Sequence, residues 1–154
     1  MKNLCLVLVA LLLTACASHP PVRSDSFIIS DTIKVPYDEA WQKTLQVLSA
    51  HGFAIDSSNK KGGVISAAET AVKLNERQAD CGTFHGISYL RDYRTSTYMT
   101  IVIDLEKISD KTTAIRVNSF LKAYFHAGVG AEMQYLSCYS FGNLEKRLIA
   151  QIRE

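Results

Sequence analysis

Two cysteines and two histidines in the second half of this 154-residue chain could do chemistry. Cys81 lies close to His85, and a cysteine nucleophile beside a histidine base is a known catalytic arrangement. With His126 and Cys138 they make four residues of the types that bind zinc, but without the C-x₂-C or H-x₃-H spacing of common zinc sites. No third residue that would orient a Cys–His pair is evident. We therefore expect no catalytic residues and no metal site, and a disulfide becomes the competing interpretation of the cysteines.

The first fifteen residues have the pattern of a signal peptide. Lys2 supplies a positive charge, and residues 4–13 form an apolar run with the length of a signal-peptide core. The run is too short to span a bilayer, which needs about 20 apolar residues. The sequence Leu-Thr-Ala-Cys at 13–16 resembles the lipobox of bacterial lipoproteins. This resemblance implies cleavage before Cys16 and acylation of that cysteine, which would anchor the mature protein to a membrane.

The implied lipid anchor sets the location and the partners that we expect. Ala17 stands where an aspartate would favour the inner membrane, so the resemblance implies the outer membrane, on its periplasmic face. Residues 17–26 contain Pro20 and Pro21, which favour extended structure, and we interpret 16–26 as the lipidated cysteine and a flexible tether. A single domain at 27–154 would follow. We expect its partners to be the membrane, through the anchor, and another envelope protein.

The cysteines that remain after processing are expected to pair. Cys5 leaves with the signal peptide and Cys16 carries the lipid, so Cys81 and Cys138 remain in a compartment that oxidises thiols. Their disulfide would close a loop of nearly sixty residues, which stabilises a fold by at most about 4 kcal/mol in the chain-entropy model. We expect Cys138 to lie just before the final helix.

The composition excludes several other classes of protein. The chain has 17 Lys and Arg against 15 Asp and Glu, for a formal net charge of +2. It has no basic stripe of the kind that nucleic-acid binding needs, so we expect no nucleic-acid partner. No second long apolar run predicts a transmembrane helix, and no motif predicts a cofactor.

The hydrophobic pattern predicts the main elements of the domain. Residues 37–52 carry one apolar stripe at helical spacing, which includes Trp41, and Gly52 suits the end of a helix. Because its neighbours on the stripe are apolar, Trp41 is expected to pack in the core rather than bind a partner. Alternation over 95–109 and 112–125 predicts a long antiparallel hairpin.

The remaining segments complete an α+β fold. A strand is expected within 27–36, two short strands on either side of the turn at 61–63, and a helix within 139–154 that includes Phe141. We interpret 70–93 as an irregular loop and 126–135 as a flexible connection. The expected fold is an antiparallel sheet of about four to five strands with two helices packed on one face.

Two segments resemble known bacterial envelope lipoproteins. In residues 35–67 a strand ends in Val-Pro, a helix has a central Trp, and a Gly-Phe-x-Ile strand, a turn and a Gly-x-Ile strand follow. This order resembles the domains of the outer-membrane assembly lipoprotein BamC and of small lipoproteins of similar kind. Residues 138–152 resemble the closing helix of such small lipoproteins, which implies that Cys138 pairs with the Cys-Gly at Cys81. The resemblance implies a fold and carries no activity with it.

One cluster has the composition of an interaction surface. Tyr89, Arg91, Tyr93 and Arg94 combine the residue types that are enriched in protein interfaces. We expect a non-enzymatic, lipid-anchored binding or scaffold module that contacts another envelope protein. The alternative is a small-ligand or lipid-binding domain with a pocket between the sheet and the C-terminal helix. An apolar pocket of roughly 300 Å³ or more would favour the alternative, whereas a filled core with an exposed aromatic patch would favour the binding module.

Overall fold

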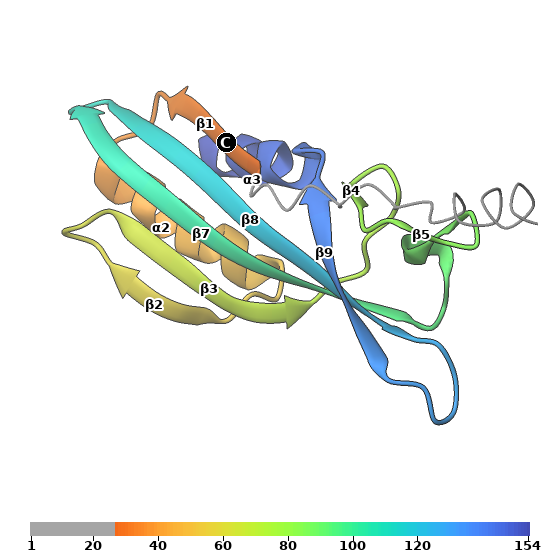
Figure 1. Cartoon of the computed structure of the whole chain (residues 1–154). Helices are drawn as coiled ribbons and strands as arrows, with labels where there is room; N and C mark the ends of the chain where they lie inside the picture. Colours follow the sequence, from red (N-terminus) through yellow and green to blue (C-terminus); the bar gives the residue numbers. More distant parts are fainter. Residues whose placement is uncertain (1–26) are drawn as a thin grey trace, which may run out of the picture.

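The structure is a computed structural model, which describes residues 27–154 (Figure 1). The predicted signal peptide, Cys16 and the tether lie outside the described residues. The α+β prediction is confirmed, with two helices and an antiparallel main sheet. The elements are β1 (Phe27–Ile33), α2 (Tyr37–Ala50), β2 (Ile55–Asn59), β3 (Val64–Ala71), β4 (Ala79–Asp80), β5 (Thr83–Phe84), β6 (Ile87–Ser88), a 3₁₀ turn η1 (Tyr89–Arg91), β7 (Thr95–Ser109), β8 (Thr112–His126), β9 (Met133–Ser140) and α3 (Asn143–Arg153).

The main sheet has seven strands, so the expected number of four to five was wrong. Its order is β2-β3-β7-β8-β9-β4, and β1 pairs with β8 in addition. The reason is the length of β8, whose fifteen residues span about 50 Å. One side of this strand receives β1 along residues 113–119 and β9 along residues 121–126. β9 itself begins at Met133, inside the segment that was expected to be a flexible connection.

Both helices lie on one face of the sheet (Figure 1). The inward residues of the β7–β8 hairpin are buried as the alternation predicted, from Met99 to Leu105 on β7 and from Ile115 to Leu121 on β8. Trp41 on α2 is only 4 % exposed and joins this core, which confirms its predicted packing role. The other face of the sheet has no helix over it among the described residues, and its side chains are therefore exposed or half-buried.

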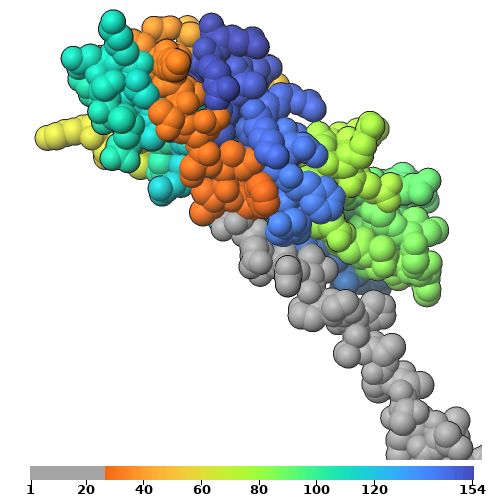
Figure 2. All heavy atoms as spheres, turned by 90° about the horizontal axis from the view of Figure 1, so that it is seen from above, coloured from red at the N-terminus to blue at the C-terminus, as the bar shows by residue number. Residues whose placement is uncertain are grey.

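The final helix begins later than the sequence pattern predicted. α3 starts at Asn143, after Gly142 in a left-handed conformation, and Phe141 lies outside it with a largely exposed side chain. A side chain at position 142 would overlap the ring of Phe27 from β1. Seen from above, β1 (orange) lies against β9 and α3 (blue), so the first described strand and the last helix close the core together (Figure 2). Neither helix within 27–154 is long and apolar enough to cross a membrane.

The turn between β2 and β3 is held against β7 by backbone contacts. The amide of Leu105 donates to the carbonyl oxygen of Gly63 at 2.7 Å. Gly63 has a φ of +77°, and a methyl group on it would overlap the carbonyl oxygen of Leu105. Gly52, beyond the end of α2, has a similar φ of +79° but open space around it. An alanine would be strained at both positions but would overlap a neighbouring atom only at position 63. Comparing the two substitutions therefore distinguishes the cost of backbone strain from that of steric overlap.

We predict that Gly63→Ala destabilises the fold more than Gly52→Ala. An alanine in the left-handed region costs about 1 kcal/mol at either position, and forcing a group into a packed site adds roughly 2 kcal/mol at position 63. Chemical denaturation of both variants measures the difference. Equal losses of unfolding free energy would show that the turn does not pack on β7 as described.

Candidate functional site

The cysteines are joined by a disulfide, as expected. Cys81 and Cys138 have an S–S distance of 2.05 Å and a Cα–Cα distance of 4.2 Å, and both are buried. Cys81 directly follows β4, which pairs with β9, and this pairing brings it to Cys138. The expected position of Cys138 just before the final helix was wrong, because it lies within β9. The disulfide therefore links the segment after β4 to the sheet.

The disulfide removes the thiol that the Cys–His interpretation needs. A disulfide sulfur has no thiolate to act as nucleophile or metal ligand. His85 is exposed in the turn between β5 and β6, and His126 is exposed at the end of β8. Among residues 27–154 no cluster of three or more His, Cys, Asp or Glu side chains could hold a metal ion.

The four residues of the expected interaction surface do not share one exposed surface. Tyr89 is only 6 % exposed, and its ring packs at 4.9 Å from that of Phe125 on β8. Its hydroxyl donates to Gln134 on β9 at 3.2 Å. Tyr89 is thus a core residue, and its assignment to an interaction surface was wrong. Tyr93, in contrast, is 95 % exposed, and Arg91 lies at the surface near Glu76.

Arg94 holds a loop rather than presenting a charge to a partner. Its guanidinium donates to both carboxylate oxygens of Asp92, at 3.0 and 2.7 Å, and to the carbonyl oxygen of Ala127 at 3.2 Å. It also lies 4.8 Å from the centre of the Phe125 ring. The hydrogen bonds from the Arg94 side chain and backbone lower the pKa of Asp92 to about 2. This network fixes the turn before β7 to the end of β8.

A row of tyrosines crosses the uncovered face of the sheet. Tyr98 on β7 packs edge-to-face on Tyr124 of β8 at 5.6 Å, and Tyr124 packs on Tyr135 of β9 at 5.7 Å. Lys122 lies 5.6 Å from the Tyr124 ring and forms an ion pair with Glu69. We define the aromatic face as this row with the apolar side chains that extend it, which are Ile28, Tyr98, Phe120, Tyr124, Met133 and Tyr135.

The aromatic face is largely open to solvent. Tyr135 is 60 % exposed and Phe120 is 48 % exposed, although both lie within strands. The sequence analysis did not identify this surface, and it placed Met133 and Tyr135 in a connection because 126–135 carries two glycines. Alternation of Met133, Tyr135 and Ser137 is the signal that could have identified β9 and its outward side chains.

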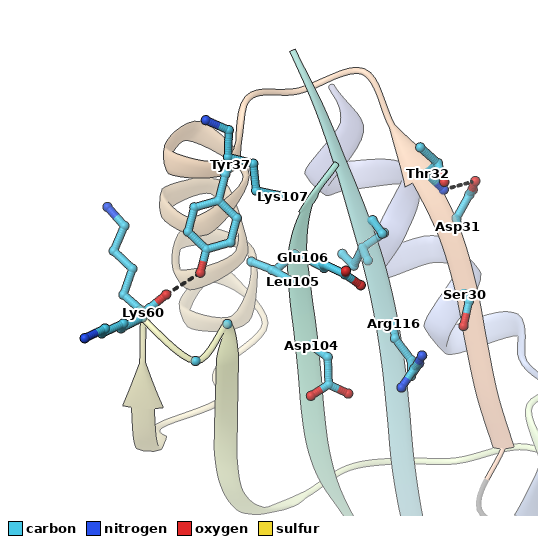
Figure 3. Close-up of a pocket in the computed structure, with 15 residues that line it drawn as sticks. Ser30, Asp31, Thr32, Tyr37, Lys60, Asp104, Leu105, Glu106, Lys107 and Arg116 are labelled. Carbon is cyan, nitrogen blue, oxygen red and sulfur yellow. Dashed lines mark hydrogen bonds between the residues drawn. The ribbon is translucent and has the colours of Figure 1, made fainter. Parts of the chain in front are cut away.

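A groove of about 760 Å³ lies at the end of the sheet where β7 turns into β8 (Figure 3). Tyr37 closes one side by donating from its hydroxyl to the carbonyl oxygen of Lys60. The Lys60 ammonium lies 2.5 Å from Asp38, and this hydrogen bond lowers the pKa of the Asp38 carboxyl. Asp104 and Arg116 face each other across the strands. The groove is polar, with charges of both signs, and it is not the apolar pocket beneath the C-terminal helix that the alternative interpretation requires.

Within residues 27–154, a small slot lies between the sheet and α3. Its volume is about 150 Å³, and apolar side chains line it, among them Phe53, Met99 and Leu148. This is about half of the smallest volume that is usual for a small-molecule site, roughly 300 Å³. The space expected for a ligand is therefore mostly filled by the core.

Comparison with protein-family models found no match, and comparison with curated protein sequences found no relative. Besides the polar groove, the described part of the chain offers two apolar features. One is the aromatic face, and the other is the slot beneath α3. The first resembles the surface of a protein interface, which is enriched in tyrosine, phenylalanine and methionine.

We predict that reduction of the Cys81–Cys138 disulfide destabilises the domain without unfolding its centre. The bond spans 57 residues, so its loss lowers the free energy of unfolding by at most about 4 kcal/mol. Denaturation with and without reductant measures this loss. Hydrogen exchange should accelerate in residues 79–94 and in β9, while the middle of the β7–β8 hairpin stays protected.

A double variant, Cys81→Ser with Cys138→Ser, is the control, because its stability should not respond to reductant. Two reactive thiols in the unfolded, unreduced wild-type protein would contradict the pairing.

Proposed function

We propose that this chain is a lipid-anchored binding module of the bacterial envelope that contacts another envelope protein through its aromatic face. The observation that carries the proposal is the pair of exposed aromatic side chains, Phe120 and Tyr135, in the middle of ordered strands. A sheet face that meets only water usually carries polar residues. Exposed apolar side chains gathered on one surface are typical of a binding site, and those of the aromatic face share one side of the sheet with Lys122 among them.

The proposed location rests on the N-terminal sequence. The lipobox-like 13–16 segment supports acylation of Cys16, and Ala17 supports the periplasmic face of the outer membrane. A tether of about ten residues would let the domain reach roughly 35 Å from the lipid surface. A BamC-like relationship is part of the same proposal, and the order β1-α2-β2-β3 over residues 27–71 is consistent with it.

A non-enzymatic role is also part of the proposal. The cysteine that could have served as a nucleophile is bonded to Cys138, and among residues 27–154 neither His85 nor His126 belongs to a group of three or more His, Cys, Asp or Glu side chains that could hold a metal ion. The alternative of a small-ligand or lipid-binding domain is supported only by the slot beneath α3, whose volume of about 150 Å³ is small for such a ligand.

Cys16→Ser should leave an unprocessed or mislocalised precursor, because the serine hydroxyl cannot accept the lipid in place of the thiol. Intact-mass analysis of the membrane-extracted wild-type protein should show an N-terminus at Cys16 that carries acyl chains. Cys5→Ser is the matched control, since Cys5 lies in the segment to be removed, and it should mature normally. Normal processing and membrane binding of Cys16→Ser would overturn the anchor.

The contact surface can be tested by photo-crosslinking in intact cells. A benzophenone amino acid at Phe120 or Tyr135 should give the same crosslinked species, identified by mass spectrometry. The same amino acid at Ile108 should not give it, because Ile108 is 57 % exposed but lies near the turn between β7 and β8, away from the tyrosine row. Phe120→Glu should abolish the crosslink from Tyr135 while the fold is retained. The same species from Ile108, or none from the aromatic face, would contradict the proposed surface.

A further inference from the structure

The slot beneath α3 differs from the other hollows in its chemistry. Its floor is apolar and deeply buried, formed by Phe53 after α2, Met99 on β7 and Leu148 on α3. Its mouth reaches the surface, because three of its lining residues, His51, Lys73 and Arg147, are exposed. The slot is therefore a small apolar recess with an open entrance.

Its size restricts what it can accept. An apolar cavity of roughly 150 Å³ holds a group of the size of benzene. The slot has this volume, which fits one phenylalanine or leucine side chain but not a drug-sized molecule or a long acyl chain. Side chains that carry much of the binding energy in protein interfaces insert into small, desolvated recesses of this kind.

The rim of the slot has one sign of charge. Lys73 and Arg147 are cations, His51 stands beside them, and none of the residues that line the slot is acidic. The nearest acid on α3 in sequence, Glu145, is buried and accepts a hydrogen bond from Ser119 of β8, and it does not line the slot. A ligand with negative charge next to its apolar group would complement this rim.

We propose that the slot is an anchor site for an acidic peptide segment of a partner protein, with one phenylalanine or leucine side chain in the recess and adjacent aspartates or glutamates on the Lys73–Arg147 rim. This inference rests on the proposed binding function and adds a second contact for the partner. The slot is separate from the aromatic face. Acidic side chains flanking the anchor would be attracted to the rim, and their attraction would weaken as salt rises.

The methionines give a direct measurement. Met99 lines the slot and Met133 lies on the aromatic face, so ¹³C-methyl labelling of methionine reports on both surfaces separately. The probe is a capped pentapeptide with phenylalanine between two aspartates, titrated into the full chain in detergent micelles. The Met99 resonance should shift and the Met133 resonance should not. Replacing the peptide phenylalanine by alanine, or both aspartates by asparagine, should weaken binding at least tenfold.

Charge reversal on the rim tests the proposal from the side of the protein. Lys73→Glu with Arg147→Glu should weaken peptide binding at least tenfold, and both positions are exposed, so the fold should be retained. Arg147→Glu alone should also weaken binding, and Lys146→Glu is its matched control, since it reverses one charge at the next position on α3 but does not line the slot. It should change the affinity less than twofold.

Several outcomes would overturn the proposal. They are equal weakening by Lys146→Glu and by the rim variant, a shift of Met133 instead of Met99, and no preference for phenylalanine over alanine. Binding of free 3-phenylpropionate as tight as that of the peptide would instead assign the slot to a small carboxylic acid. Crosslinking from Phe120 does not depend on the slot. If crosslinking from Phe120 fails but the peptide binds, only the proposal for the aromatic face is overturned. If crosslinking succeeds but the peptide does not bind, only the proposal for the slot is overturned.

Discussion

The backbone ladder between β7 and β8 is the interaction on which the rest of the structure depends. It pairs the strands from Thr95 opposite Phe125 to Ser109 opposite Thr112, and it is the longest pairing in the sheet. β3 takes its register from β7, and both β1 and β9 take theirs from β8. The helices then cover the apolar face that the hairpin creates. β8 pairs with β7 on one side and is long enough to pair with both β1 and β9, end to end, on the other. The strands outside the hairpin have at most eight residues and are too short for this.

The connections of the chain explain why the other face stays open. α2 joins β1 to β2, and α3 follows β9, and both return to the same side of the hairpin. The outward side chains of β7, β8 and β9 therefore have no cover from residues 27–154. An ordinary solvent face would carry charges at these positions, whereas this one carries tyrosines that pack on one another. Each ring in the row packs edge-to-face on a neighbour, and side chains that are already packed lose less entropy when a partner binds.

The sequence predicted those parts of the fold in which local pattern and environment agree. Strict alternation identified the β7–β8 hairpin, the helical stripe placed Trp41 in the core, and the even number of cysteines in an oxidising compartment indicated their pairing. β9 was missed because Gly128 and Gly130 led to the prediction of a flexible connection up to residue 135, whereas the connection ends before Met133. Tyr89 looked like a surface residue, since nothing local shows that Phe125, far along the chain, covers it. The alternative interpretation anticipated a pocket between the sheet and the C-terminal helix, but the small volume of the slot could not be predicted, because its walls come from four separate segments.

The disulfide also determines how the protein would respond to mechanical force. Because it connects Cys81 to Cys138, a pull on the two ends of the chain is transmitted across the sulfurs and bypasses everything between them. About 200 Å of extended polypeptide, including the whole β7–β8 hairpin, is thereby shielded from tension. Under tension, β1, α2, β2, β3 and α3 can be stretched, while the hairpin remains a closed, unloaded ring.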